Sequence, residues 1–260
     1  MGQKRMNFNS DAAVREDMLE GRNAVFEALK AGRTIDKLLV AKGDREGSLI
    51  KLTAMARQAG AVVQEADRRK LDSMSPTGAH QGVIAMCAMH EYASVEDILS
   101  AARESDRPGL IVICDEINDP HNLGAVIRTA NAAGAAGVII PKRRSAGLSA
   151  AAVKASAGAS EHTLVARVAN LPSAIDELKK NGFWILGADM AGSTDYFNAD
   201  MTGASAVVIG SEGAGIGRLV KEKCDFLLRI PMFGQINSLN ASVAGAILIY
   251  EAVRQRAAKL

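Results

Sequence analysis

Short apolar runs alternate with helix-like segments from residue 109 to residue 260. The first run, at 110–114, is apolar at every position rather than at every second one. Such runs are typical of strands buried on both faces, as in a parallel sheet between two layers of helices. This part of the chain therefore predicts an α/β domain with a parallel sheet. Its expected strands are 110–114, 138–140, 163–168, 183–186, 206–209 and 226–230, and its expected helices are 123–133, 171–180 and 242–256.

A smaller α/β unit is predicted upstream, over residues 18–90. Asn23 is expected to cap its first helix, because an asparagine side chain accepts hydrogen bonds from the free N–H groups of a first turn. Residues 1–17 are polar and predict a flexible tail. The charged segment 91–108, which contains a helix-like stretch at 95–102, is expected to link the two domains.

The composition excludes several classes of protein. The formal charge of +2 and the pI of about 8.4 allow a nucleic-acid partner without demanding one. The three cysteines have no CxxC spacing, and the four histidines have no metal-ligand spacing, so we expect no disulfide framework and no metal. No apolar stretch approaches the ~18 residues of a membrane span, and no secretory signal starts the chain, so we expect no membrane partner and a cytoplasmic location.

Ligands of open α/β sheets bind beyond the carboxyl ends of the strands, where three segments hold unusual residues. The first segment, 118–130, contains Asn122 and Arg128. One interpretation makes Asn122 a helix cap and Arg128 a surface residue. The other places a permanently charged fork beside a helix start, where phosphate would bind. The residues alone leave both open.

The second segment, 210–217, is a glycine-rich loop after an expected strand. Glycine lets a ligand approach the backbone, and the carboxylate of Glu212 favours a functional loop over a simple turn. The dinucleotide fingerprint fails because Arg218 stands at its third glycine position, and no Lys-Ser/Thr pair completes a phosphate loop.

The third segment, 230–244, crowds small polar residues before a helix. One cap needs only one of them. The others are expected to bind a polar ligand, with Leu239 as an apolar wall. These polar residues are Asn237, Ser238, Asn240 and Ser242.

Taken in order, the three segments resemble the motifs of the SpoU (TrmH) branch of the SPOUT methyltransferases, and 154–161 adds to the resemblance. The resemblance covers residues 109–260. The N-terminal unit is similar, at 20–25 and 80–83, to the ribosomal-protein-like RNA-binding domain of the subgroup that methylates a guanosine ribose of 23S rRNA. Relatives often have histidine at the position of Asn23.

The resemblance implies a parallel-sheet domain with a C-terminal trefoil knot, a fold that ordinary topology rules would not suggest. It implies an S-adenosylmethionine-dependent enzyme that methylates the 2′-hydroxyl of an RNA ribose, and a homodimer whose site lies at the subunit interface. Gly210, Ile230 and Leu239 would hold the cofactor, largely through backbone groups. The polar reaction site would consist of Arg128, Asn122, Glu212, Asn240 and Ser242.

Arg128 is the first candidate for the chemistry. The family assigns its equivalent to activation of the hydroxyl, but an arginine keeps its proton at neutral pH. We therefore expect it to hold a phosphate and stabilise the developing alkoxide, with base action as the alternative. Two other functions stay open: methylation of tRNA or another rRNA site, and a non-catalytic role in ribosome assembly. The basic run 142–144 is either a solvated loop or a phosphate contact.

Overall fold

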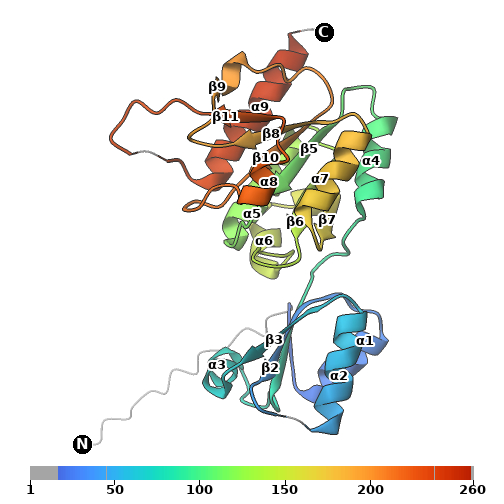
Figure 1. Cartoon of the computed structure of the whole chain (residues 1–260). Coiled ribbons are helices and arrows are strands. Elements are labelled where there is room, and N and C mark those ends of the chain that lie inside the picture. Colours follow the sequence, from blue (N-terminus) through green and yellow to red (C-terminus); the bar gives the residue numbers. More distant parts are fainter. Residues whose placement is uncertain (1–16, 45, 237, 259–260) are drawn as a thin grey trace, which may run out of the picture. The chain divides into compact units, whose positions relative to one another are not determined.

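The computed structural model describes residues 17–44, 46–236 and 238–258, which form two compact units (Figure 1). The division lies between Cys87 and Ala88. Most of the predicted tail, and Asn237, lie outside the described residues. Asp17, the last residue of that tail, is buried, and its carbonyl oxygen accepts a hydrogen bond of 2.7 Å from the N–H of Cys87.

The first unit is a four-stranded sheet with helices on both faces. Val25, Leu49 and Leu52 fill the core beneath two helices on one face. Leu71 packs with Ile84 in a separate cluster on the other. The strand order is β1-β4-β2-β3, in which only β2 and β3 run parallel. The elements are β1 (Met18–Glu20), α1 (Arg22–Lys30), β2 (Ile35–Ala41), α2 (Gly47–Gln58), β3 (Val62–Ala66), α3 (Arg68–Met74) and β4 (Val83–Cys87).

The second unit is the parallel α/β domain that the sequence predicts. Its seven strands have the order β7-β6-β5-β10-β8-β11-β9, and every neighbouring pair is parallel. The elements are α4 (Val95–Glu104), β5 (Leu110–Cys114), α5 (Pro120–Ala132), β6 (Gly137–Pro141), α6 (Ala150–Ala155), η1 (Ala159–Glu161), β7 (Val165–Val168), α7 (Leu171–Lys180), β8 (Trp184–Ala188), β9 (Thr194–Asp195), η2 (Tyr196–Asn198), β10 (Ser205–Ile209), α8 (Arg218–Lys221), β11 (Phe226–Arg229) and α9 (Ala241–Ala257).

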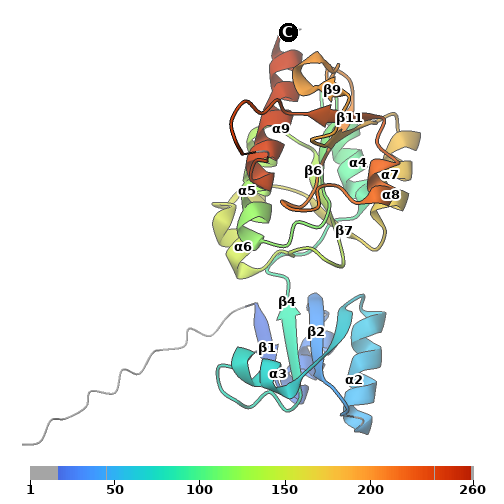
Figure 2. The same cartoon turned by 60° about the vertical axis from the view of Figure 1, so that its left-hand side comes forward.

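Both faces of this sheet are covered, which explains the uninterrupted apolar runs. Along β5, Leu110, Val112 and Cys114 belong to the core under α5 and α9. The alternate residues Ile111 and Ile113 belong to the core under α4 and α7. Figure 2 shows these helix pairs on opposite sides of the sheet. Because successive side chains of a strand point to opposite faces, a strand between two helical layers needs apolar residues throughout.

The segment expected as a linker, 91–108, packs with the second unit. Its helix α4 begins at a capping box, in which the Ser94 hydroxyl accepts a hydrogen bond from the N–H of Asp97 and the Asp97 carboxylate accepts one from the N–H of Ser94. Ile98 and Leu99 of α4 are buried in the core beneath the sheet. The structure thus divides the chain earlier than the segment predicted as the link.

Strands β5 and β10 are neighbours at the centre of the sheet although the chain returns to this place only after about 90 residues. They pair from Leu110 with Ser205 to Cys114 with Ile209. The loops that follow them therefore meet at the same edge, the carboxyl edge of the sheet. The trefoil knot expected in this domain stays a prediction. Within the described residues, no helix has the length and apolarity needed to span a membrane.

Candidate functional site

A pocket of 300 Å³ lies at the carboxyl edge of the second sheet. It is formed by the loops that follow β8, β10 and β11, together with the start of α9. Its size is at the lower end of the range for small-molecule sites. The lining residues are Ala188, Asp189, Met190, Ala191, Ile209, Gly210, Ser211, Glu212, Gly213, Ala214, Gly215, Lys221, Leu228, Ile230, Met232, Ser238, Leu239, Ala241 and Ala244.

The loop after β10 folds back on itself and lines the pocket. Ser211 and Gly215 exchange two backbone hydrogen bonds, of 3.0 and 2.9 Å. A Cβ atom at Gly210 would lie 2.1 Å from the carbonyl carbon of Gly215, closer than any side chain tolerates. Position 210 thus requires glycine because the loop closes on itself there, whether or not a ligand also approaches the backbone. The closed loop presents Glu212 at its turn.

Three polar side chains from distant parts of the chain meet beside the pocket. The side-chain amide of Asn122 donates a hydrogen bond of 2.9 Å to Glu212 Oε1. The amide of Asn240 donates one of 2.9 Å to Asn122 Oδ1 and another to Glu212. The structure therefore brings together one residue from each of the three predicted motifs. We call Asn122, Glu212 and Asn240 the polar triangle.

Asn240 also caps α9. Its Oδ1 accepts hydrogen bonds from the N–H of Ser242 at 3.0 Å, from the N–H of Val243 at 3.3 Å and from the hydroxyl of Ser242 at 2.6 Å. The oxygen of this amide is thus used for the helix start, and its NH₂ group for the polar triangle. Ser242 reaches the triangle only through Asn240, since its hydroxyl donates to the cap.

Asn122 is not a helix cap. The helix that carries Asn122, α5, starts with Pro120 and is capped by Asp119, whose Oδ1 accepts a hydrogen bond of 2.9 Å from the N–H of His121. Proline suits this position because the first N–H groups of a helix have no partner within it. With the cap supplied elsewhere, the side chain of Asn122 is available to join Glu212. The interpretation of Asn122 as a cap is therefore wrong.

Arg128 lies outside the polar triangle. Six positions along a helix correspond to about 240° of rotation, so Arg128 and Asn122 project from different sides of α5. Arg128 is exposed, and within the described part of the chain it makes no ion pair or hydrogen bond with the three residues of the triangle. The structure places it on the same helix as the site without joining it to the other candidate residues.

The three residues predicted to hold the cofactor, Gly210, Ile230 and Leu239, all line the pocket. Apolar side chains, among them Ile209 and Leu228, form much of the wall. The glycine-rich loop after β10 adds backbone groups, and the lining also includes the carboxylates of Asp189 and Glu212. An apolar slot with backbone and carboxylate acceptors fits S-adenosylmethionine, which has a flat adenine ring, a ribose diol and a cationic sulfur.

Asp189 and Lys221 are pocket residues that the three motifs do not include. Asp189 follows β8, and its Oδ1 accepts a hydrogen bond of 2.8 Å from the N–H of Ala191. Its Oδ2 forms an ion pair with Lys221 of α8. The predicted strand at 183–186 carried the signal for Asp189, because the same rule about carboxyl ends applies to it. The sequence contained no such signal for Lys221, because only the tertiary fold brings this residue to the pocket.

Asp115 ties the end of β5 to the far side of the glycine loop. This buried carboxylate accepts a hydrogen bond of 2.7 Å from the N–H of Gly217. Burial raises the pKa of Asp115, and the hydrogen bond from Gly217 opposes that rise. The contact holds the base of the loop that carries Glu212.

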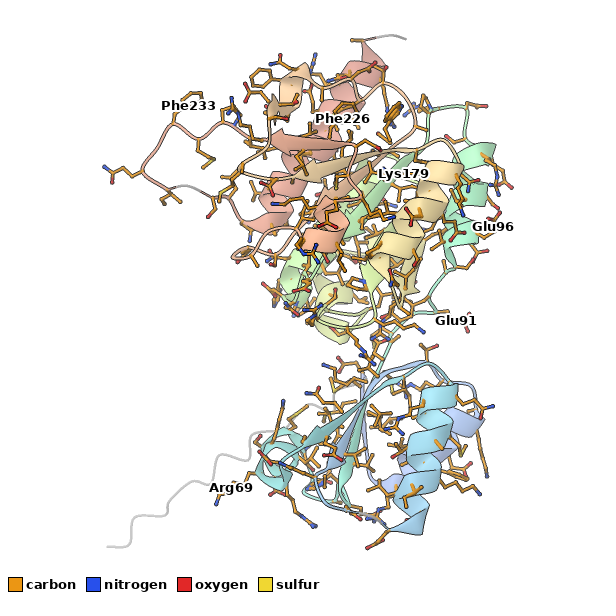
Figure 3. All side chains as sticks on the ribbon, in the orientation of Figure 1. Arg69, Glu91, Glu96, Lys179, Phe226 and Phe233 are labelled. Carbon is orange, nitrogen blue, oxygen red and sulfur yellow. The ribbon has the colours of Figure 1, made fainter. Side chains whose placement is uncertain are left out.

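The loop between β11 and α9 extends from the domain and carries exposed apolar side chains. Phe233 is 96% exposed and points away from the rest of the domain (Figure 3). Ile236 in the same loop is 74% exposed. Both ends of this loop line the pocket, with Met232 on the side of β11 and with Ser238 and Leu239 on the side of α9, so the exposed side chains between them stand beside the candidate site.

Comparisons with known proteins agree over nearly the whole chain. The SpoU rRNA Methylase family matches residues 109–250, and the family described as RNA 2′-O ribose methyltransferase substrate binding matches residues 18–93. The chain is 48% identical over 240 residues to the Bacillus subtilis protein YacO, covering 92% of this chain and 96% of that protein. It is 44% identical over 243 residues to a protein of Staphylococcus aureus strain MSSA476, covering 94% and 98%. Both names assign these proteins to the TrmH family of tRNA/rRNA methyltransferases.

Two solved structures extend the likeness to the cofactor. One is the SpoU methyltransferase AviRb from Streptomyces viridochromogenes in complex with AdoMet, with 26% identity, a TM-score of 0.59 and coverage of 93% of this chain and 90% of that chain. The other is an AdoMet-bound rRNA methyltransferase from Sinorhizobium meliloti, with 28% identity, a TM-score of 0.58 and coverage of 91% and 86%.

Proposed function

Because the chain belongs to the SpoU (TrmH) family and is an S-adenosylmethionine-dependent RNA 2′-O-ribose methyltransferase, we propose that its substrate is a guanosine of 23S rRNA. The observation that carries ribose methylation is the polar triangle beside the pocket, next to which a ribose would have to bind. The first unit matches the family described as RNA 2′-O ribose methyltransferase substrate binding, which supports RNA as the molecule that is methylated. The choice of a 23S rRNA guanosine rests on the similarity of residues 20–25 and 80–83 of the first unit to the subgroup that methylates such a guanosine.

The chemistry requires little from the protein beyond alignment and removal of one proton. The bound cofactor supplies a methyl group on a positively charged sulfur, which is already an activated donor. The chain must hold the ribose so that its O2′ faces that methyl group, and it must accept or shield the charge that develops on O2′. Hydrogen-bonding side chains fixed by one another are suited to this alignment, because little order is lost when the substrate arrives.

We assign roles to the candidate residues on this basis. Glu212, held by Asn122 and Asn240, orients the ribose hydroxyl. Arg128 binds the phosphate next to the target nucleotide and stabilises negative charge on O2′. Ser242 keeps Asn240 in place through the helix cap. Gly210, Ile230 and Leu239 hold the cofactor at the pocket wall.

We propose that the enzyme is a homodimer with its site at the subunit interface. The separation of Arg128 from the polar triangle supports this arrangement, because a second copy would place the arginine near a triangle that is not its own. Exposed apolar side chains of α9, Val243 near the site and Tyr250 about two turns farther along the helix, support an interface there. The cytoplasmic location expected from the sequence stays a prediction.

Mapping of ribose methylation across the RNA of a deletion strain tests the substrate. We expect the loss of one 2′-O-methylguanosine in 23S rRNA, its return with the wild-type gene and no change in tRNA. Loss of a tRNA mark alone would contradict the proposal and favour the tRNA alternative, which the names of the relatives also allow. An unchanged map, together with no calorimetric binding of S-adenosylmethionine, would favour a non-catalytic RNA-binding protein.

A further inference from the structure

A charged pair forms part of the cofactor pocket, and the three motifs leave it without a role. Asp189 and Lys221 both line the pocket and form an ion pair with each other. The side chain of Asp189 is only 10% exposed, whereas that of Lys221 is 39% exposed. A carboxylate so far removed from water is costly unless it is hydrogen-bonded, so the donors around Asp189 have to be accounted for.

The carboxylate of Asp189 is held in one orientation. Oδ1 accepts the N–H of Ala191 at 2.8 Å, and Oδ2 faces the ammonium group of Lys221. A carboxylate has about four lone-pair sites, so each oxygen keeps capacity for one more donor. Two fixed acceptors side by side match a ligand with two neighbouring donors.

The cofactor presents one such group. Its hydrogen-bond donors are the adenine amino group, the two ribose hydroxyls and the ammonium group, and only the hydroxyls form a vicinal pair. Carboxylates bind ribose hydroxyls in the same way at the strand ends of dinucleotide-binding sheets. The other carboxylate of the pocket, Glu212, accepts hydrogen bonds from Asn122 and Asn240 at Oε1 and is assigned above to the ribose of the RNA substrate. Asp189 is therefore the pocket carboxylate to which no ligand has been assigned.

We propose that Asp189 binds the ribose diol of S-adenosylmethionine and that Lys221 is a positioning residue that holds Asp189. The proposal rests on the cofactor site described above and adds to it a selection for the sugar. It explains why α8, a short helix outside the three motifs, is folded against the loop after β8.

Calorimetry on the full chain tests the proposal with three probes: S-adenosylhomocysteine and its 2′-deoxy and 3′-deoxy analogues. The wild type should bind each deoxy analogue about tenfold more weakly than the parent, the loss typical of a hydrogen bond to a charged group. Asp189→Asn should bind the parent about tenfold more weakly and should no longer distinguish it from the analogues. Equal binding of all three probes by the wild type would overturn the proposal without any variant.

A matched control comes from a similar pair outside the pocket. Lys223 binds Asp176 at 2.7 Å, and neither residue lines the pocket. Asp176→Asn should keep wild-type affinity and wild-type preference for the diol. If Asp189→Asn lost the same factor for the parent and both analogues, Asp189 would contact some other group of the cofactor, and the proposal would be wrong.

The role of Lys221 needs a separate probe, because its ammonium group is also suited to the carboxylate of the cofactor. 5′-Methylthioadenosine keeps the diol and lacks that carboxylate. Lys221→Met should weaken the binding of S-adenosylhomocysteine and of methylthioadenosine by the same factor. A loss confined to S-adenosylhomocysteine would instead place Lys221 on the cofactor carboxylate. A wild type that bound none of the probes would overturn both this proposal and the assignment of the cofactor pocket.

Discussion

At the scale of single residues, the site divides into side chains that fix one another and one that stands alone. Asn122, Glu212 and Asn240 are joined by three hydrogen bonds. Arg128 is exposed on the same helix as Asn122 and is not bonded to any of them. A pre-arranged group and an unattached cation are suited to different tasks, the first to orientation and the second to binding an anion that comes with the substrate.

Arg128→Ala should therefore lower RNA methylation by about 100-fold or more, the effect of removing one stabilising donor from a transition state. Calorimetry should give an unchanged affinity for S-adenosylmethionine, since Arg128 does not line the pocket. Arg103→Ala, which removes an exposed arginine paired with Glu96 on α4, is the control for charge. Near-wild-type turnover of Arg128→Ala would remove this residue from the mechanism.

Asp115 predicts a pH dependence of stability. Burial raises the pKa of Asp115 in the folded state, so the folded protein holds this proton more tightly than the unfolded chain. The protein should thus lose stability as the pH rises from about 3.9, the unfolded value, through the raised folded pKa. Asp115→Asn has no titrating carboxyl group at this position, so it should not show this pH-dependent loss of stability. Its amide oxygen can still accept the hydrogen bond from the N–H of Gly217.

The expected result is that Asp115→Asn gains free energy of unfolding relative to the wild type as the pH rises through this window, with a constant difference at higher pH. Urea denaturation at a series of pH values measures it. A difference that did not change with pH would show that the titration of Asp115 does not contribute to stability.

The residues of the polar triangle were predictable, and their partners were not. Glu212 stood out as a carboxylate among glycines, and Asn240 as a polar residue in excess of one cap. That Asp119 caps α5, and so leaves Asn122 free for Glu212, follows from backbone geometry that the sequence pattern does not specify. Asp189 was indicated only by its place after the expected strand 183–186, because its segment belongs to none of the three motifs.

At the scale of elements, the start of α9 serves stability and function through one side chain. Asn240→Ala should lose both the cap and the triangle, with a decrease of about 1 kcal/mol in the free energy of unfolding. Asn240→Asp keeps an oxygen for the N–H groups of Ser242 and Val243 but replaces the amide donors with charge beside Glu212. We therefore expect Asn240→Asp to retain more stability than Asn240→Ala and to lose methylation equally.

Thermal melts and a methyl-transfer assay of the two variants separate these effects. The interpretation would be contradicted if Asn240→Asp methylated RNA like the wild type.

The contact between α5 and α6 depends on a missing side chain. A Cβ atom at Gly124 would lie 2.4 Å from the carbonyl oxygen of Ala152 and 2.6 Å from Cβ of Ala155. Gly124→Ala should separate the two helices and cost about 1–3 kcal/mol of stability. Gly203→Ala is the matched control, because nothing lies within 4 Å of a Cβ there. Denaturant melts that gave the two variants equal midpoints would contradict the close packing.

Long elements were predictable from their apolar pattern, and short ones were not. The expected strand 110–114 and helix 242–256 correspond to β5 and α9 within a residue. β9 has only two residues, and α8 only four, so neither has a period to detect. Asn23 was expected to cap α1, but that helix starts at Arg22, after Gly21, whose φ of 88° favours glycine.

At the scale of the whole molecule, the two units have separate cores. The first unit buries its own clusters, around Leu38 and around Leu71, within residues 17–87. A fragment of residues 17–87 should therefore fold alone, near the lower size limit for an independent domain. A cooperative melt followed by circular dichroism is the expected result. A fragment without such a transition would show that the first unit depends on the second.

The order of strands in the second sheet could not be predicted from the sequence. Apolar runs identify a strand but do not identify its neighbour, because every buried strand offers the same kind of surface. β10 lies between β5 and β8, so sequence order and spatial order differ at the centre of the sheet. That insertion places Gly210 near Asp115, and it is what assembles the site from three distant motifs.

The insertion of β10 also affects synthesis of the chain. Residues 110–188 leave the ribosome with β5 and β8 already made, but these strands have no direct pairing with each other until residues 205–209 arrive between them. Contacts between parts so distant in sequence form slowly, and their edges stay exposed meanwhile. The nascent enzyme must therefore wait for its last quarter before the centre of its sheet can close, and a ribosome that stalls before β10 would release a chain in which β5 lacks one neighbouring strand and β8 lacks both.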